Sequence, residues 1–271
     1  MISKIGIVNR DDCLANGRIK YIPDDSGEYY PYELTCFSKS VYVTADLEKP
    51  RTIKHAGFCD FILDEVEEPV KVRDEAENRR KSYNRAKNNL FDLLMCTTEF
   101  DCFITLTLDG SKIDRYSYDE AVKALGVWLD NRVRRKGLKY VLVPEFHKDG
   151  AVHFHGLFNF NSLKAVRAVS PYSGLPMSDD SGRPIYNISD YKLGFSTAIP
   201  LSGKNARVAT AKYCYKYITK SKGCKVGGRY YLSGGKLGRP RYSFVNIDYN
   251  SVDCAEINIK NANMCMKKLK L

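Results

Sequence analysis

The sequence predicts an α+β fold in which helices flank an antiparallel sheet. Two observations carry this prediction: short β-branched and aromatic runs alternate with charged amphipathic segments, and a tight-turn signal joins two such runs in mid-chain. The 271 residues are 44% hydrophobic and 28% charged. This composition is typical of a globular protein and excludes disordered and collagen-like classes.

Residues 1–97 are expected to form an N-terminal extension. Strand-like runs occur at 19–22 and 40–43, with a turn at 24–27. From Val72 to Met95 the pattern becomes that of a charged helix with an apolar end. No family pattern is evident in this segment, so its role stays open.

Residues 98–250 are expected to form the main domain, and residues 251–271 a C-terminal tail. The buried strand 102–108 and the amphipathic helix 117–136 come first. The later elements expected in this domain are a hairpin of strands 139–147 and 151–160, a helix at 162–169, an exposed loop at 170–184, a strand near 193–199, a helix near 205–221, and strands near 229–232 and 241–248.

The nine cysteines are scattered and contain no CxxC pair, which favours reduced thiols in a cytoplasmic protein. A site built from Cys13, Cys36, His55 and Cys59 is the alternative. The first residues lack the apolar run of a signal peptide, and no apolar stretch is long enough to cross a bilayer. We therefore expect no membrane association and a cytoplasmic location.

Two of the four histidines lie two residues apart in the strand-like run Val152-His153-Phe154-His155-Gly156. In a strand, His153 and His155 point to one side while Phe154 points to the other. Two parallel imidazoles favour a metal site. The alternative is the polar face of a half-exposed strand.

The hairpin supplies a third candidate ligand. A three-residue loop at 148–150 places Glu145 directly opposite His153, whereas a two-residue turn pairs Phe146 with His153 and turns Glu145 away. His147 shares the face of Glu145 but adjoins the turn, and we expect it to be solvated. Two histidines and a carboxylate with open positions suit Mg²⁺ or Mn²⁺.

A second cluster lies in the helix near 205–221. Tyr213 and Tyr217 are four residues apart and share one helix face, and Lys216 and Lys220 have the same spacing. Tyr215 is rotated away from that face. The alternative is an amphipathic helix that buries its aromatic residues.

These residues resemble a known family. The run FITLT at 103–107, His153-Phe154-His155, and Tyr213-x-x-x-Tyr217-x-x-Lys220 occur in the order of the three motifs of HUH endonucleases. The chain resembles the rolling-circle replication initiators of single-stranded DNA phages and plasmids, particularly the two-tyrosine type, over about residues 100–245.

The resemblance implies an RRM-like sheet of about five antiparallel strands, with the histidines on a central strand and the tyrosines on a flanking helix. It implies a nickase and strand transferase in which a metal on His153, His155 and Glu145 orients the scissile phosphate. A tyrosine then attacks and leaves a 5′-phosphotyrosine link and a free 3′-hydroxyl that primes synthesis. Tyr213 and Tyr217 are the candidate pair; which one cuts first stays open, as does whether only one is catalytic.

Other implied roles are less specific. Lys216 and Lys220 would contact phosphate or assist proton transfer, or they form a solvated helix face. Thr105 and Thr107 are interpreted as structural support. Single-stranded DNA and an origin hairpin are the implied partners. Because no Walker A motif is present, a host helicase would unwind the duplex for the polymerase, in the cytoplasm of a bacterial host.

The net charge of +11 is unevenly distributed. Residues 191–247 contain twelve basic and no acidic side chains, so the rest of the chain sums to −1. Tyr230, Tyr231, Tyr242 and Phe244 lie among these cations and could stack on unpaired bases. We expect this segment to provide a phosphate track.

Three alternatives remain. A Y2-type transposase would use the same chemistry, and so would a conjugative relaxase. Relaxases usually carry their tyrosine before the histidine motif, and the order here is the reverse. The third is a non-catalytic RRM-like nucleic-acid-binding protein, which would bind DNA without nicking it.

Overall fold

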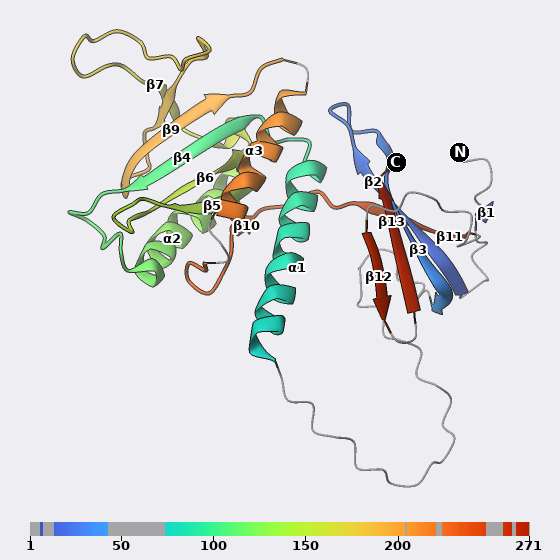
Figure 1. The fold of residues 1–271 in the computed structure, drawn as a ribbon. Helices are drawn as coiled ribbons and strands as arrows, with labels where there is room; N and C mark the ends of the chain where they lie inside the picture. Colours follow the sequence, from blue (N-terminus) through green and yellow to red (C-terminus); the bar gives the residue numbers. More distant parts are fainter. Residues whose placement is uncertain are drawn as a thin grey trace. The chain divides into compact units, whose positions relative to one another are not determined.

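The computed structural model describes residues 6–7, 14–42, 74–203, 205–220, 224–247, 257–261 and 264–270. The chain divides into two compact units: Met1–Val72 with Pro240–Leu271, and Arg73–Arg239. Each unit is built on its own antiparallel sheet (Figure 1). The α+β class predicted from the sequence is confirmed.

The sheet of the second unit has seven strands in the order β10-β5-β6-β4-β9-β8-β7. Its central strands are held by continuous antiparallel pairing of β5 with β6, β6 with β4, and β4 with β9. The strand bounds are β4 Cys102–Leu108, β5 Tyr140–Phe146, β6 Val152–Phe158, β7 Ala165–Arg167, β8 Tyr186–Ile188, β9 Gly194–Pro200 and β10 Leu232–Gly234.

Three helices within the described residues accompany this sheet: α1 (Glu75–Cys96), α2 (Tyr118–Lys136) and α3 (Ala206–Lys220). Helix α1 begins where the Asp74 carboxylate accepts hydrogen bonds from the second and third backbone N–H groups that follow it. Helix α2 ends at Gly137, whose left-handed backbone (φ 65°) is favourable for glycine. Neither α1 nor any other described helix combines the length and apolar character that a membrane span needs.

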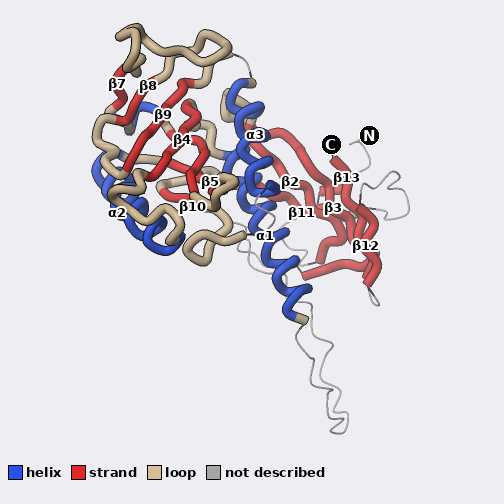
Figure 2. Tube along the Cα trace, turned by 60° about the vertical axis from the view of Figure 1, so that its left-hand side comes forward, coloured by secondary structure: helices blue, strands red, loops and turns tan. Residues whose placement is uncertain are grey.

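The two faces of the sheet are covered by different helices (Figure 2). Alternate residues of β4 are buried, and they form one core with the inward face of α2. Helix α3 packs on the opposite face against β5 and β6, and α1 packs on α3. The α2 core buries Cys102, Ile104, Leu106, Leu108, Ala121, Leu125, Leu129, Phe154 and Phe158. The face toward α3 carries the histidines.

The first unit holds a six-stranded sheet in the order β1-β11-β2-β3-β13-β12. Ile19, Leu34 and Val245, from three neighbouring strands, form its small core. The strand bounds are β1 Gly6–Ile7, β2 Leu14–Pro23, β3 Tyr29–Tyr42, β11 Arg241–Asn246, β12 Ile257–Asn261 and β13 Met264–Lys270.

This division differs from the segments expected from the sequence. Helix α1 belongs to the second unit because its apolar end packs on α3, so residues 73–97 are not part of an N-terminal extension. Strand β11 pairs with β2 in the first unit, and the expected tail 251–271 carries two strands of the same sheet. Of the alternative cysteine site, Cys36 is buried in β3, and the other three residues lie outside the described part of the chain.

Three element predictions also need correction. The helix expected at 162–169 is wrong: a short 3₁₀ turn (Phe160–Ser162) leads into β7, whose backbone pairs with β8. The strand expected at 229–232 begins at Leu232 as β10. The sheet has seven strands instead of about five because β7, β8 and β10, each three residues long, extend its edges.

Candidate active site and metal centre

The hairpin between β5 and β6 fixes the position of Glu145. The backbone N–H of His147 donates to Ala151 O (2.9 Å), that of Gly150 donates to His147 O (3.0 Å), and Gly150 has φ +88°. The loop is therefore 148–150, with glycine in the left-handed position of a three-residue loop. Glu145 lies directly opposite His153, as the three-residue loop predicts.

Glu145, His153 and His155 converge on the face of the sheet toward α3. Glu145 Oε2 lies 3.0 Å from His153 Nε2 and 2.8 Å from His155 Nε2. One ligand atom from each residue lies within 4.8 Å of the others. Both histidine side chains are about nine-tenths buried, while Glu145 is more open. This arrangement, called the triad below, joins the three residues that the sequence predicts as metal ligands.

The second ring nitrogen of each histidine is also engaged. Thr105 Oγ1 lies 3.0 Å from His155 Nδ1, and His147 Nε2 lies 2.5 Å from His153 Nδ1. A proton on Nδ1 leaves the Nε2 lone pair directed toward Glu145, which is the tautomer that metal binding needs. His155 Nε2 is buried and makes no well-aligned hydrogen bond. The triad therefore fits a divalent cation with open coordination positions.

Electrostatics favour the same protonation states. Burial and the neighbouring His153 lower the pKa of His155 to about 4, partly opposed by Glu145. Burial raises the pKa of Glu145, but its hydrogen bond to His153 and the charges of His155, His153 and Lys220 outweigh burial and lower it. A neutral imidazole and an ionised carboxylate are the forms that coordinate cations.

Helix α3 places both predicted tyrosines beside the triad. The Tyr217 ring stacks on His155 with ring centroids 4.5 Å apart and planes at 14°. The Tyr217 hydroxyl donates to the Tyr213 hydroxyl at 2.6 Å. Tyr217 is 5% exposed and Tyr213 46%. Burial is the main cause that raises the pKa of Tyr217, followed by its hydrogen bond to Tyr213.

The two predicted lysines differ in position. Lys220 Nζ lies 3.7 Å from Glu145 Oε1 and 5.1 Å from the centroid of the Tyr217 ring. Lys216 is exposed and makes no contact with the triad among the described residues. Tyr215 turns away from the site, as its helical phase predicts, and packs edge-on against Phe91 of α1.

Residues 101–222 match a family model of replication-associated proteins, the one described by the name ORF2. This segment is a replication-associated domain. The match includes the triad and both tyrosines, and it confirms the resemblance to rolling-circle replication initiators; the two-tyrosine subtype stays a prediction. Neither a search of curated proteins nor one of solved structures finds a protein that matches the chain.

The basic segment that includes the end of the replication-associated domain is only partly available for DNA. Arg207 is buried and donates to Met95 O (2.8 Å), at the end of α1, where a cation stabilises the helix carbonyls. Arg241 belongs to the other unit, and Lys204 and Lys222 lie outside the described residues. The other eight are on the second unit, exposed or partly exposed: Lys192, Lys212, Lys216, Lys220, Lys225, Arg229, Lys236 and Arg239.

Sequence reasoning missed the residues that orient the histidines. Thr105 was interpreted as structural support, and His147 as solvated. His147 is exposed, as expected, but it also contacts His153. Thr105 faces His155 because β4 pairs with β6 in a register that sets the two residues opposite each other. The strand order that creates this pair is a tertiary property without a local sequence signal.

Proposed function

We propose that the chain is a metal-dependent, site-specific single-stranded DNA endonuclease and strand transferase that starts and terminates rolling-circle replication. The observation that carries the proposal is the pair of hydroxyls on Tyr213 and Tyr217, held next to the triad by the stack of Tyr217 on His155. A nucleophile beside a metal-binding cluster is the arrangement that phosphoryl transfer needs.

Each residue has a role in the proposed reaction. A divalent cation bound by Glu145, His153 and His155, Mg²⁺ or Mn²⁺, would polarise the scissile phosphate and offset its charge. The tyrosine oxygen attacks phosphorus, and the bond from phosphorus to the 3′ oxygen breaks. The phenol loses its proton and the 3′ oxygen gains one, so the products are a 5′-phosphotyrosine and a free 3′-hydroxyl.

Lys220 is the lysine better placed to assist. Its ammonium group lies beside both Glu145 and the Tyr217 ring, so it can stabilise negative charge on the phosphate or the phenol oxygen. Lys216 lies on the exposed side of α3 and is assigned to phosphate contact at most. Paired tyrosines allow one to cut at initiation and the other to accept the strand at termination.

The open sheet face supports single-stranded DNA as the substrate. Thr107 of β4 pairs with His153 on one side and with Phe195 of β9 on the other, so Glu145, His153, Thr107 and Phe195 form one row on one face. Phe195 is 59% exposed and lies two strands, about 10 Å, from His153. An exposed aromatic ring at this position can stack on an unpaired base.

The proposed partners follow from this chemistry. The substrate would be an origin presented as single strand next to a hairpin. Because the chain has no Walker A motif, unwinding would depend on a host helicase, and the free 3′-hydroxyl would be extended by a host polymerase.

A covalent-adduct assay tests the proposal. With Mn²⁺ or Mg²⁺, the protein should nick an oligonucleotide from a pool of candidate origins and stay attached to the 5′ end of the downstream fragment. Mass spectrometry should then find the modified peptide in α3. Binding to the pool without any adduct would contradict the proposal and favour the non-catalytic nucleic-acid-binding protein.

A further inference from the structure

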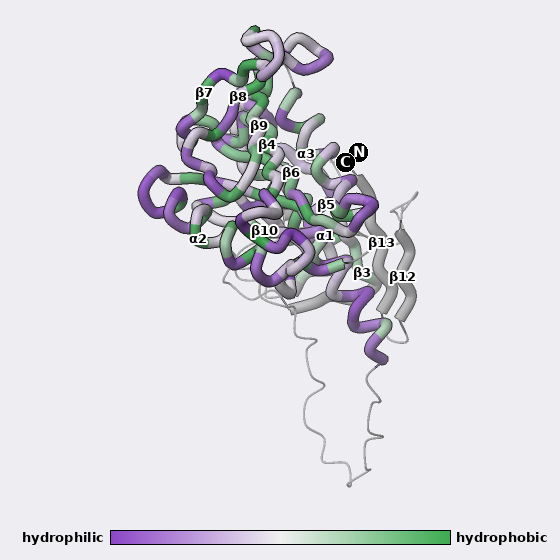
Figure 3. The backbone as a smooth tube through the Cα atoms, turned by 90° about the vertical axis from the view of Figure 1, so that its left-hand side faces the viewer, coloured by the Kyte–Doolittle hydropathy of each residue, from purple (hydrophilic) through white to green (hydrophobic). Residues whose placement is uncertain are grey.

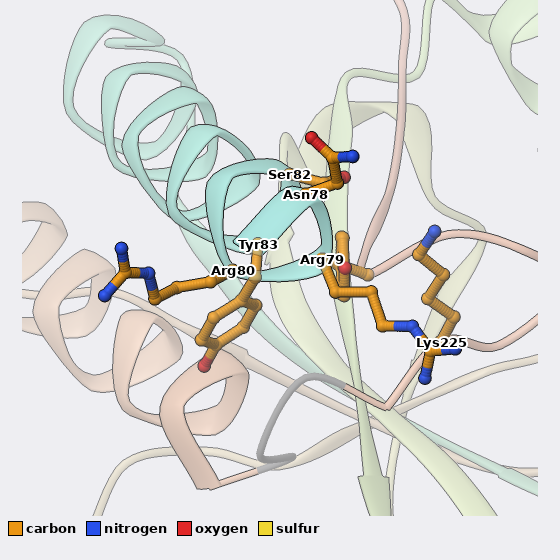
Figure 4. Close-up of a pocket in the computed structure, with 7 residues that line it drawn as sticks. Asn78, Arg79, Arg80, Ser82, Tyr83 and Lys225 are labelled. Atoms are coloured by element: carbon orange, nitrogen blue, oxygen red, sulfur yellow. The ribbon is translucent and has the colours of Figure 1, made fainter. Parts of the chain in front are cut away.

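A cavity of about 860 Å³ lies outside the site already described, between the first turns of α1 and the segment that follows α3. Arg79, Arg80, Tyr83, Lys225 and Tyr230 are among the residues that line it (Figure 4). These first turns of α1 are hydrophilic (Figure 3). The replication-associated domain ends before Lys225 and begins after α1, so the matched segment does not include this cavity.

The floor of the cavity is rigid and aromatic. The Tyr83 and Tyr230 rings lie 5.4 Å apart, and Tyr230 is 8% exposed. The Tyr83 hydroxyl donates to Ile218 O at 2.6 Å, which attaches this part of α1 to the end of α3. Half-buried Tyr83 therefore presents a fixed ring edge to the cavity.

The rim of the cavity is cationic. It contains three basic side chains and no carboxylate. Arg79 lies 3.5 Å from Glu75, but both side chains are over 80% exposed, and such pairs contribute little. Among the described residues, neither Arg80 nor Lys225 pairs with a carboxylate. Cations that converge without an acidic partner favour a polyanion.

The cavity is continuous with the helix that carries the candidate nucleophiles. Lys87 Nζ lies 5.5 Å from the ring centroids of both Tyr83 and Tyr215. Tyr215 is on α3, between Tyr213 and Tyr217 in the chain. Alternating tyrosines and cations therefore extend from the cavity along α1 to α3.

We propose that this cavity is a second DNA-binding site, which holds the phosphate backbone of the single strand that leads to or from the triad. The inference rests on the proposed function and extends it. Arg80 and Lys225 contact phosphates, and the Tyr83 edge contacts an unpaired base. A duplex is a poorer ligand because its bases are stacked on each other and do not reach the floor.

The test compares DNA of two lengths. Fluorescence anisotropy measures binding of labelled oligothymidylates of about 8 and about 30 nucleotides to the full chain, at several salt concentrations. The double variant Arg80→Ala/Lys225→Ala should bind the long strand about tenfold more weakly, with a salt slope lower by about 1.4, and the short strand unchanged. Arg80→Glu/Lys225→Glu should lose more.

A matched control removes two exposed cations elsewhere. Arg134→Ala/Lys136→Ala, at the end of α2 on the opposite face of the sheet, should change long-strand binding less than twofold. Equal losses for both lengths, equal losses in the control variant, or an equal loss for a duplex of the long sequence would each overturn the second site.

Nicking separates this inference from the proposed function. If the double variant forms the adduct on short origin DNA at the wild-type rate and loses only long-strand affinity, both hold. If the wild-type chain never forms an adduct while the length-dependent loss persists, the proposed function fails and the second site stands. If nicking occurs and the loss does not depend on length, the second site fails alone.

Discussion

The ring of Tyr217 lies parallel to the ring of His155, with centroids 4.5 Å apart and planes at 14°. This contact joins α3 to β6 and brings a phenol hydroxyl next to the metal-ligand cluster. Because the Tyr213 hydroxyl is only 2.6 Å from that of Tyr217, a phosphate held at the triad would be within reach of both. The geometry thus offers two nucleophiles to one site.

The first prediction concerns these two nucleophiles. Tyr213→Phe and Tyr217→Phe, taken singly, should each still form a covalent adduct with origin DNA, at a reduced rate. The double variant should form none, because phenylalanine keeps the ring stack on His155 and removes both hydroxyls. Denaturing gels of labelled DNA measure the adduct. If one single variant already abolishes it, only one tyrosine is catalytic.

The second prediction concerns the metal. Isothermal titration with Mn²⁺ should show one site in the wild-type chain and none in Glu145→Gln, since an amide lacks the charge of the carboxylate. Cleavage should be lost with the metal, while salt-sensitive DNA binding stays within about twofold. Asp149→Asn removes a carboxylate from the same hairpin, outside the triad, and should bind Mn²⁺ normally. A loss in both variants would point to general destabilisation of the hairpin.

The third prediction assigns Thr105 as a positioning residue. Thr105→Val removes the oxygen that holds His155 Nδ1 and should weaken Mn²⁺ binding by about 10- to 100-fold, as lost partners of metal-bound histidines commonly do. Thr105→Ser keeps the hydroxyl and should restore most of the affinity. If Ser and Val behave alike, the threonine serves only for packing.

Much of the site could be predicted from the sequence because local rules determine it. Strand alternation puts His153 and His155 on one side, loop length sets Glu145 opposite His153, and helical spacing pairs Tyr213 with Tyr217. These relations depend on a few neighbouring residues and two periodicities.

The remaining features depend on contacts between distant segments. Strand β11 directly follows the second unit in the chain, yet Val245 packs with Ile19 and Leu34, so the strand joins the other sheet. Arg207 reads as a candidate phosphate ligand and is instead buried at the end of α1. Neither relation has a sequence signal within its own segment.

The fourth prediction concerns pH and the chain without metal. Histidine has an ordinary pKa of 6.5, and burial with His153 lowers that of His155 to about 4. The folded state thus favours the neutral ring, and the unfolded chain takes up the proton first as pH falls. The contribution to stability is complete above pH 6.5 and is lost progressively toward pH 4. Glu145, with its lowered pKa, adds a loss in the same direction below its ordinary value of 4.5.

Melting temperatures measured with a chelator between pH 7.5 and pH 5 check this. The wild-type value should fall more steeply with decreasing pH than that of His155→Gln, which cannot take up the proton. Parallel curves would show that His155 does not titrate differently in the folded and unfolded chains.

The fifth prediction concerns Phe195, which occupies the same cross-strand row as Glu145 and His153 and is largely exposed. If a base next to the scissile phosphate stacks on it, Phe195→Ala should weaken single-strand binding by about tenfold, which corresponds to about 1.4 kcal/mol, within the range for one stacked base. Phe195→Trp should preserve binding. Tyr172→Ala removes a 99% exposed aromatic from a loop of the same unit and should have no effect. Because Phe195 contacts the strand and no reacting atom, the loss should appear in KM, with kcat nearly unchanged.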